Sequence, residues 1–226
     1  MQTTNFDAKF YQLITTNGLL RPFDMLLIGG TGVGKSSTIN AIFGTEAAKV
    51  GYGVDPETKV ISSYLVGNYF RIHDSAGLGE GASADLAHSQ AITQHLLKPV
   101  EVSGRRYGLI DMALVILDGS SRDLGTAFKL LQTVVLKAIE PERVAVAINQ
   151  ADMAMKGRHW DSRLNRPEPA LNAYLAEQAI SVQRRITEST GCKIRLPVAY
   201  SAKCQFNIDG LVDHIVACIP KTRRPL

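Results

Sequence analysis

The chain has 226 residues, the length of one sizeable domain or of one domain with a short appendage. Hydrophobic residues make up 45% and charged residues 20%, and the mean hydropathy is +0.01, so the composition excludes disordered, collagen-like and coiled-coil proteins. The net charge of +4 comes from 25 cationic and 21 anionic residues, which excludes the dense cationic stripe of a typical nucleic-acid-binding protein.

The cysteines and the apolar runs bear on location. Cys192, Cys204 and Cys218 are odd in number and lack metal-ligand spacing, which argues against a disulfide framework or a zinc site. Residues 1–9 are too polar for the apolar core of a signal peptide, and the longest apolar runs, such as residues 112–117, have the length of a buried strand. We therefore expect a cytoplasmic protein with no membrane-spanning segment.

Helical and strand-like segments alternate along the chain. Apolar residues at helical spacing predict a first helix within residues 6–20, so we expect residues 1–20 to form an N-terminal helical extension and residues 21–226 to form the main domain. Strands are predicted at residues 23–28, 59–66, 69–73, 112–117, 143–148 and 197–200. Helices are predicted at residues 35–43, 84–97 and 124–138, from about residue 169 to 188, and at residues 208–219.

This alternation predicts an α/β fold with a mostly parallel, six-stranded sheet. The turn pair Gly67-Asn68 indicates a hairpin that makes one edge strand antiparallel. Residues 98–111 and 156–169 are predicted to be long loops carrying arginines, either solvated or used to dock a partner. The basic tail, residues 221–226, is expected to be frayed.

A glycine-rich segment after the first strand fits the phosphate-binding pattern G-x-x-x-x-G-K-[ST]. Its glycines allow backbone N–H groups to turn toward phosphate oxygens, and the following helix adds the positive end of its dipole. Lys35 would reach the β- and γ-phosphates, and the Ser36 hydroxyl would ligate Mg²⁺. The candidate phosphate-binding residues are Gly30, Thr31, Gly32, Val33, Gly34, Lys35, Ser36 and Ser37.

A second polar segment predicts which base is bound. Asn149 and Asp152 follow the strand at residues 143–148, at the sheet edge where ligands bind in this architecture. A carboxylate there accepts two hydrogen bonds from N1–H and the exocyclic amine of guanine, whereas adenine would leave it unpaired. We therefore predict guanine rather than adenine.

Two further segments end predicted strands on the same edge. Asp74 can hold Mg²⁺, usually through water, and the Gly77 N–H can contact a γ-phosphate. Backbone amides of Ser201, Ala202 and Lys203 can contact the base.

These four segments, in this order, resemble the G1, G3, G4 and G5 motifs of small P-loop GTPases. The resemblance covers residues 23–219 and implies the three-layer Ras-like G-domain fold, hydrolysis of GTP to GDP and phosphate, and a Mg²⁺ cofactor. The family also has a switch threonine that closes over Mg²⁺ and contacts the γ-phosphate. Thr58 is our choice for it, and Thr45 is the rival.

Departures from the pattern favour the translation-factor-related class. Leu78 stands where Ras-like proteins have a water-orienting glutamine, which implies slow turnover. Gly32 replaces the asparagine of potassium-activated members, and Gln150 replaces the lysine whose stem covers the base. Residues 32–44 are similar to the Era, septin, immunity-related, chloroplast outer-envelope and prophage-encoded Era-like branches, several of which dimerise across the nucleotide.

The resemblance implies a Mg²⁺-dependent GTP switch, slow alone and stimulated by a homodimer partner or an effector. Lys35, Thr58 and Gly77 would be its catalytic residues, and Ser36, Thr58 and Asp74 its metal ligands. The alternative hypothesis for the function is a GTP-dependent assembly module with little hydrolysis, and a third hypothesis is an ATPase. We expect no DNA partner, and nothing in the sequence supports contact of the basic tail with RNA or a membrane.

Overall fold

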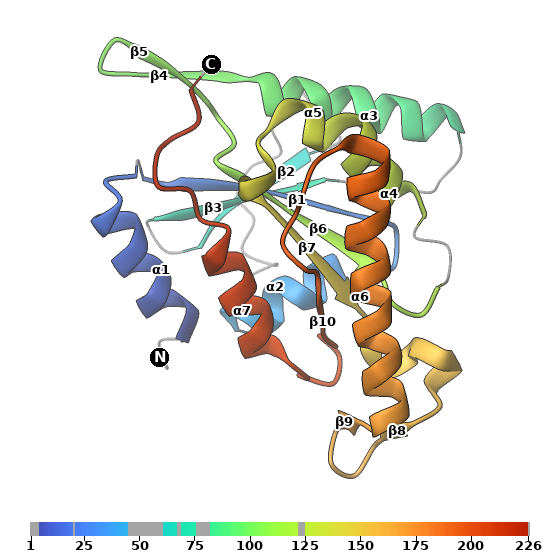
Figure 1. Ribbon diagram of the computed structural model, residues 1–226. Coiled ribbons are helices and arrows are strands. Elements are labelled where there is room, and N and C mark those ends of the chain that lie inside the picture. Colours follow the sequence, from blue (N-terminus) through green and yellow to red (C-terminus); the bar gives the residue numbers. More distant parts are fainter. Residues whose placement is uncertain are drawn as a thin grey trace.

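The computed structural model describes residues 5–19, 21–44, 61–66, 69–75, 82–121 and 125–225 (Figure 1). Six strands form the central sheet in the order β10-β7-β6-β1-β3-β2. Their bounds are β1 Phe23–Gly29, β2 Ile61–Val66, β3 Phe70–Ser75, β6 Met112–Asp118, β7 Val144–Asn149 and β10 Val198–Ala199. Strand β1 pairs in parallel with β3 and β6, and β2 is antiparallel to β3, which confirms the predicted sheet and its antiparallel edge.

Helices cover both faces of this sheet (Figure 1). On one face, α1 (Asn5–Thr16), α2 (Lys35–Phe43) and α7 (Ile208–Ala217) contribute to one hydrophobic core. On the other face, α3 (Ala82–Leu97) and α6 (Pro169–Thr190) contribute to a second core. This is the predicted three-layer arrangement. Among the described helices, none has both the length and the apolar content to cross a bilayer.

Helix α1 packs onto the sheet through an aromatic cluster. The Phe10 ring is fully buried and meets the rings of Phe23 and Phe70 edge-on, with centroid distances of 5.3 and 4.6 Å. Such pairs add to the free energy of apolar burial. The helix therefore shares the core of the sheet, while the domain division at residue 20 stays a prediction.

The helix predicted at residues 124–138 has a π-helical interruption. It consists of α4 (Gly125–Leu130), a π-helical segment (Leu131–Val135) and α5 (Leu136–Ala138). A π-bulge inserts a residue into the helical ladder, which a hydrophobic period does not reveal.

The two segments predicted as loops contain hairpins. In the first, β4 (Pro99–Val102) pairs with β5 (Arg105–Gly108) around Ser103-Gly104, whose φ values of 53° and 73° are those of a tight type I′ turn. In the second, β8 (Trp160–Asp161) pairs with β9 (Arg166–Pro167). The turn pair Ser103-Gly104 was the signal in the sequence for the first hairpin.

The expectation of a frayed tail is wrong for residues 221–225. Pro225 forms an antiparallel bridge with Tyr107, and the Gly108 N–H donates to the Arg224 carbonyl at 3.0 Å. Arg224 is 3% exposed, and its guanidinium donates to buried carbonyl groups in the body of the domain. Basic composition indicated solvation, but Arg224 supplies buried hydrogen bonds instead.

Candidate functional site

The phosphate-binding loop, residues 30–34, joins β1 to α2 at the carboxyl end of the sheet. Gly32 and Gly34 have φ values of 75° and 91°, in the region that favours glycine. A Cβ atom on Gly34 would lie 2.5 Å from Asn149 Nδ2, so a side chain there would push the loop and the neighbouring strand end apart. The close approach explains why this position must be glycine.

Lys35 lies at the mouth of this loop and faces Asp74. Its Nζ donates to the carbonyls of Gly29 and Gly30 at 3.1 and 3.3 Å. Burial lowers the pKa of Lys35, and the charge of Asp74 opposes that shift. The ammonium group can exchange these carbonyls for phosphate oxygens without leaving the site.

Asp74 and Ser36 fit a magnesium site. Burial raises the pKa of Asp74 to about 6, against the attraction of Lys35, and within the described part of the chain its buried Oδ1 has no hydrogen-bond partner. A buried oxygen without a donor is suited to a hard cation, because Mg²⁺ prefers oxygen ligands. Ser36 is exposed in the first turn of α2. These two residues are the ones that would hold the metal.

Asn149, at the end of β7, joins two of the predicted motifs. Its Nδ2 donates to the Val33 carbonyl at 2.7 Å, and its Oδ1 accepts from the Ala202 N–H at 3.0 Å. The side chain is buried, so these bonds fix the phosphate-binding loop against the segment after β10. The sequence predicted Asn149 near the nucleotide, and the structure gives it this bracing role.

Asp152 has the properties needed to bind a base. It is 7% exposed, and its buried Oδ1 has no hydrogen-bond partner among the described residues. A carboxylate in that position is costly unless a donor reaches it. Gln150, two residues earlier, has a φ of 63°, and its Nε2 donates to the Gly32 carbonyl at 3.0 Å, so its side chain crosses to the phosphate-binding loop.

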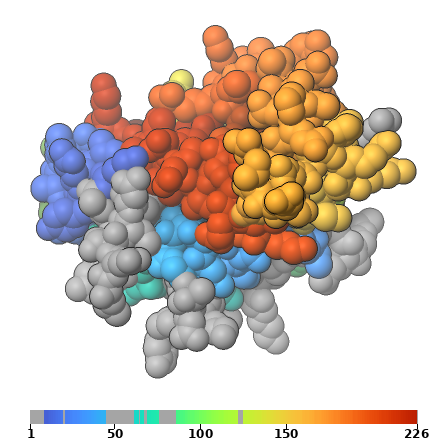
Figure 2. All heavy atoms as spheres, turned by 90° about the horizontal axis from the view of Figure 1, so that it is seen from below, coloured from blue at the N-terminus to red at the C-terminus, as the bar shows by residue number. Residues whose placement is uncertain are grey.

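The segment after β10 is held from several sides. Ser201 is fully buried, and its Oγ accepts from the Cys204 N–H at 3.1 Å. The Ala202 carbonyl accepts from Gln205 Nε2 at 2.8 Å, whereas Lys203 is exposed. Figure 2 shows the face where this segment (orange-red) meets α2 (light blue) and residues 151–168 (amber). The three candidate motifs are therefore neighbours in space.

Thr38 and Tyr200 also support the site and were not predicted from the sequence. Thr38 Oγ1 donates to the Gly34 carbonyl at 2.8 Å, so at 2.7 Å it accepts from the buried Tyr200 hydroxyl. Burial raises the pKa of Tyr200 above its ordinary value, which keeps the hydroxyl a donor. This contact joins residues far apart in the sequence, so no local pattern indicates it.

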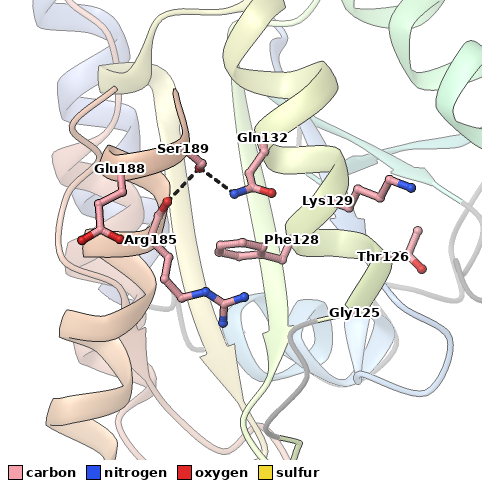
Figure 3. A pocket seen from close by; sticks show the side chains of 8 residues that line it. All are labelled: Gly125, Thr126, Phe128, Lys129, Gln132, Arg185, Glu188 and Ser189. Atoms are coloured by element: carbon pink, nitrogen blue, oxygen red, sulfur yellow. Dashed lines mark hydrogen bonds between the residues drawn. The ribbon is translucent and has the colours of Figure 1, made fainter. Parts of the chain in front are cut away.

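A separate pocket of about 660 Å³ lies away from these motifs, between α4 and α6 (Figure 3). Arg185 lies 4.7 Å from the centroid of the Phe128 ring, and Gln132 Nε2 donates to Ser189 Oγ at 2.6 Å. The carboxylate among the pocket's described lining residues, Glu188, is exposed rather than buried, and these residues include no glycine-rich loop between a strand and a helix. We therefore place the candidate site at the phosphate-binding loop.

Some of the site residues predicted from the sequence lie outside the part of the chain that the structure describes. Thr58, Gly77, Leu78 and the rival Thr45 lie outside the described residues. Trp160, in the second predicted loop, packs edge-on against Phe206 with a centroid distance of 5.4 Å.

Comparison with protein families matches residues 24–159, more than half of the chain, to the family described as 50S ribosome-binding GTPases. Among curated proteins, the chain is 29% identical over 141 residues to the tRNA modification GTPase MnmE of Sulfurovum sp. (strain NBC37-1). That alignment covers 62% of this chain and 29% of the relative, so the chain spans about three tenths of the relative's length.

Solved structures share the fold at low identity. Toc33 from Arabidopsis thaliana, in complex with Mg²⁺ and GMPPNP, has a TM-score of 0.59 at 15% identity, covering 100% of this chain and 98% of that one. The LeoA bacterial dynamin GTPase from ETEC has a TM-score of 0.57 at 12% identity, with coverages of 97% and 39%. The G domain of the T. maritima FeoB iron transporter has a TM-score of 0.50 at 18% identity, with coverages of 88% and 99%.

Proposed function

The chain belongs to the 50S ribosome-binding GTPase family, and on that basis we propose that it binds GTP at the carboxyl end of the sheet and hydrolyses it to GDP and phosphate. The observation that carries the proposal concerns Asp152, in the segment whose Gln150 side chain reaches the phosphate-binding loop. The buried Oδ1 of Asp152 has no hydrogen-bond partner among the described residues. Guanine supplies the two donors that this carboxylate accepts, and adenine supplies neither. Charge and burial thus support guanine specificity.

The residues divide the phosphate chemistry among them. Amides of residues 30–34 and the start of α2 hold the phosphates, with Ser37 and Lys35 at the helix start. Ser36 and Asp74 hold Mg²⁺, which supplies charge neutralisation at the phosphate oxygens. Catalysis then rests on positioning and electrostatic stabilisation by Lys35 and backbone amides rather than on a side-chain base.

The remaining assignments rest on the sequence. Thr58 would close over the metal and Gly77 would contact the γ-phosphate, which makes the protein a switch. Of the three amides predicted to contact the base, that of Lys203 would do so, because the Ser201 N–H already donates to the Phe206 carbonyl at 3.1 Å and the Ala202 N–H to Asn149 Oδ1. We also propose that the protein belongs to the Era, septin and immunity-related branch and that it is cytoplasmic. Its GTP turnover would be slow alone and stimulated by a second copy or an effector.

Binding and turnover of GTP and ATP test the assignment, with Asp152→Asn as the variant. We expect GTP selectivity in the wild type and a preference for XTP in Asp152→Asn, because the xanthine C2 carbonyl accepts from an asparagine amide. A gain of XTP binding shows that the variant is folded. Asp161→Asn is the matched control: Asp161 is half-buried at the end of β8, where an amide oxygen can still accept from the Arg163 and Leu164 N–H groups, so GTP binding should be unchanged. Equal use of ATP and GTP by the wild type would refute guanine specificity.

A dilution series of the wild type separates the switch from the assembly module. Turnover per molecule that rises with protein concentration supports stimulation by a second copy. Concentration-dependent association with GTP and no phosphate release would favour the alternative, a GTP-dependent assembly module.

A further inference from the structure

A second pocket, of about 580 Å³, lies at the other end of the sheet from the phosphate-binding loop. Three segments line it: the residues after α1, the β4–β5 hairpin and the C-terminal tail. Figure 1 shows the hairpin and the C-terminus side by side, away from α2. Its lining consists of Asn17, Gly18, Val102, Ser103, Arg105, Tyr107, Lys221, Thr222 and Arg223.

Among the described residues, the lining is cationic and contains no carboxylate. Within the described part of the chain, Arg105 and Lys221 are exposed and form no ion pair. Arg223 forms the floor: its side chain is 8% exposed, its Nε lies 3.4 Å from Asp111 Oδ1, and among the described residues that Nε has no hydrogen-bond partner. Three cationic groups are thus gathered at one pocket without an anion among its lining residues.

The hairpin geometry keeps its carboxylate away from the pocket. Side chains alternate between the two faces of a β-ribbon, and directly paired residues share a face. Arg105 pairs with Val102, and Tyr107 pairs with Val100, on the face that lines the pocket. Glu101 pairs with Arg106 on the opposite face.

The backbone segments that carry the cations are fixed to one another, and Arg223 is also held by two carboxylates. Asn17 Nδ2 donates to the Pro220 carbonyl at 3.3 Å, which fixes the tail at its start, and the pairing of Tyr107 with Pro225 fixes its end to the hairpin. Below the pocket, Arg223 lies 3.6 Å from Asp24 Oδ2 and 3.4 Å from Asp111 Oδ1. Such preorganisation lowers the entropic cost of binding.

We propose that this pocket is a second anion site, which binds a phosphomonoester group. A phosphomonoester carries nearly two negative charges at neutral pH, matching the two unpaired cations, and it presents three acceptor oxygens. The hydroxyl groups of Ser103, Thr222 and Tyr107 supply further donors. The group can come from a small soluble molecule or from a lipid headgroup.

The test uses the full chain saturated with GDP and Mg²⁺, so that the phosphate-binding loop is filled. GDP binding is measured first, which reveals a failure of the proposed function separately. Glycerol 3-phosphate is then titrated by calorimetry, and vesicles of phosphatidylcholine containing phosphatidic acid are tested by flotation. Binding of either probe supports the site, and which one binds identifies the source.

The variants are chosen from the two faces of the hairpin. Arg105→Ala and Lys221→Ala should each weaken binding about tenfold, the loss expected for one charge-assisted contact. Arg106→Ala removes the same charge from the opposite face and should change affinity less than about twofold. Equal losses in Arg105→Ala and Arg106→Ala would overturn the proposal. So would equal binding to phosphatidylglycerol vesicles, or binding of an RNA hairpin but of neither phosphate probe.

Discussion

Substitution of Arg224, whose guanidinium is buried, is the strongest test of how the C-terminal tail is held against the domain. It donates from Nε to the Ile110 carbonyl and from Nη1 to the Ala138 carbonyl, each at 3.1 Å, and from Nη2 to the Leu96 carbonyl. Leu96 and Ala138 lie at the C-terminal ends of α3 and α5, where a cation also interacts favourably with the helix dipole. Arg224→Ala would leave all three carbonyls unpaired.

The expected cost follows from the number of bonds lost. Each buried hydrogen bond contributes about 1 to 1.5 kcal/mol net, so Arg224→Ala should lower the free energy of unfolding by about 3 to 4 kcal/mol. For a domain of this size, about 1 kcal/mol corresponds to 2–4 °C, so Tm should fall by about 6–16 °C. Thermal and urea unfolding followed by circular dichroism measure this change.

Two controls separate the buried clamp from a loss of surface charge. Lys221→Ala removes an exposed cation from the same tail and should change stability by less than about 0.5 kcal/mol. Gly108→Ala keeps Arg224 but places a methyl group against its guanidinium, so it should destabilise the fold by displacing that group. A Tm for Arg224→Ala within about 2 °C of the wild type would show that the hydrogen bonds of Arg224 do not stabilise the tail, and would favour the prediction of a frayed tail.

Four further substitutions test the candidate site itself. Because the pKa of Asp74 is raised from 3.8 to about 6, ionisation of this carboxyl group lowers the stability of the fold progressively as the pH rises from about 4 to 6, and the full loss is present above pH 6. Asp74→Asn should therefore raise the free energy of urea unfolding at pH 7.5 by about 1 to 3 kcal/mol in metal-free buffer, with a smaller gain at pH 5, while it weakens Mg²⁺-dependent nucleotide binding. An equal gain at both pH values would contradict the pKa. Tyr200→Phe removes the donor to Thr38 and should cost about 1 kcal/mol, whereas Thr38→Val should cost more in the same unfolding assay, because it leaves the Tyr200 hydroxyl unpaired. Gly34→Ala should retain the fold but weaken GDP binding at least about tenfold in calorimetry, because its φ of 91° and the nearby Asn149 amide oppose a Cβ.

Local spacing predicted the parts of the site that are contiguous in sequence. The phosphate-binding loop was recognisable because its glycines, Lys35 and Ser36 lie within a few residues between a strand and a helix. Asp152 was recognisable because it follows a buried strand. In both segments the chemistry and the backbone requirement act over the same few residues, so sequence alone indicates them.

Contacts between distant segments could not be predicted in this way. The Thr38–Tyr200 bond and the bracing of the loop by Asn149 depend on which strand ends become neighbours. The prediction of a frayed tail failed for a related reason. Basic side chains stay in solvent unless the fold offers them buried hydrogen-bond acceptors, and here two helix-end carbonyls and one loop carbonyl accept from Arg224. Composition cannot reveal carbonyls that only the fold brings together.

A buried cluster of Asp24, Arg71 and His73 links a contact between distant segments to one of the motifs that the sequence predicted. Asp24 accepts from Arg71 Nε at 2.5 Å and lies 2.7 Å from His73 Nε2, so β3 is tied to β1 by side chains as well as by the sheet ladder. The next residue along β3 is Asp74, which faces Lys35 at the phosphate-binding loop. Because a strand is stiff over two or three residues, fixing Arg71 and His73 also fixes where the Asp74 carboxylate can lie. Residues outside the nucleotide motifs therefore help to position the proposed metal ligand.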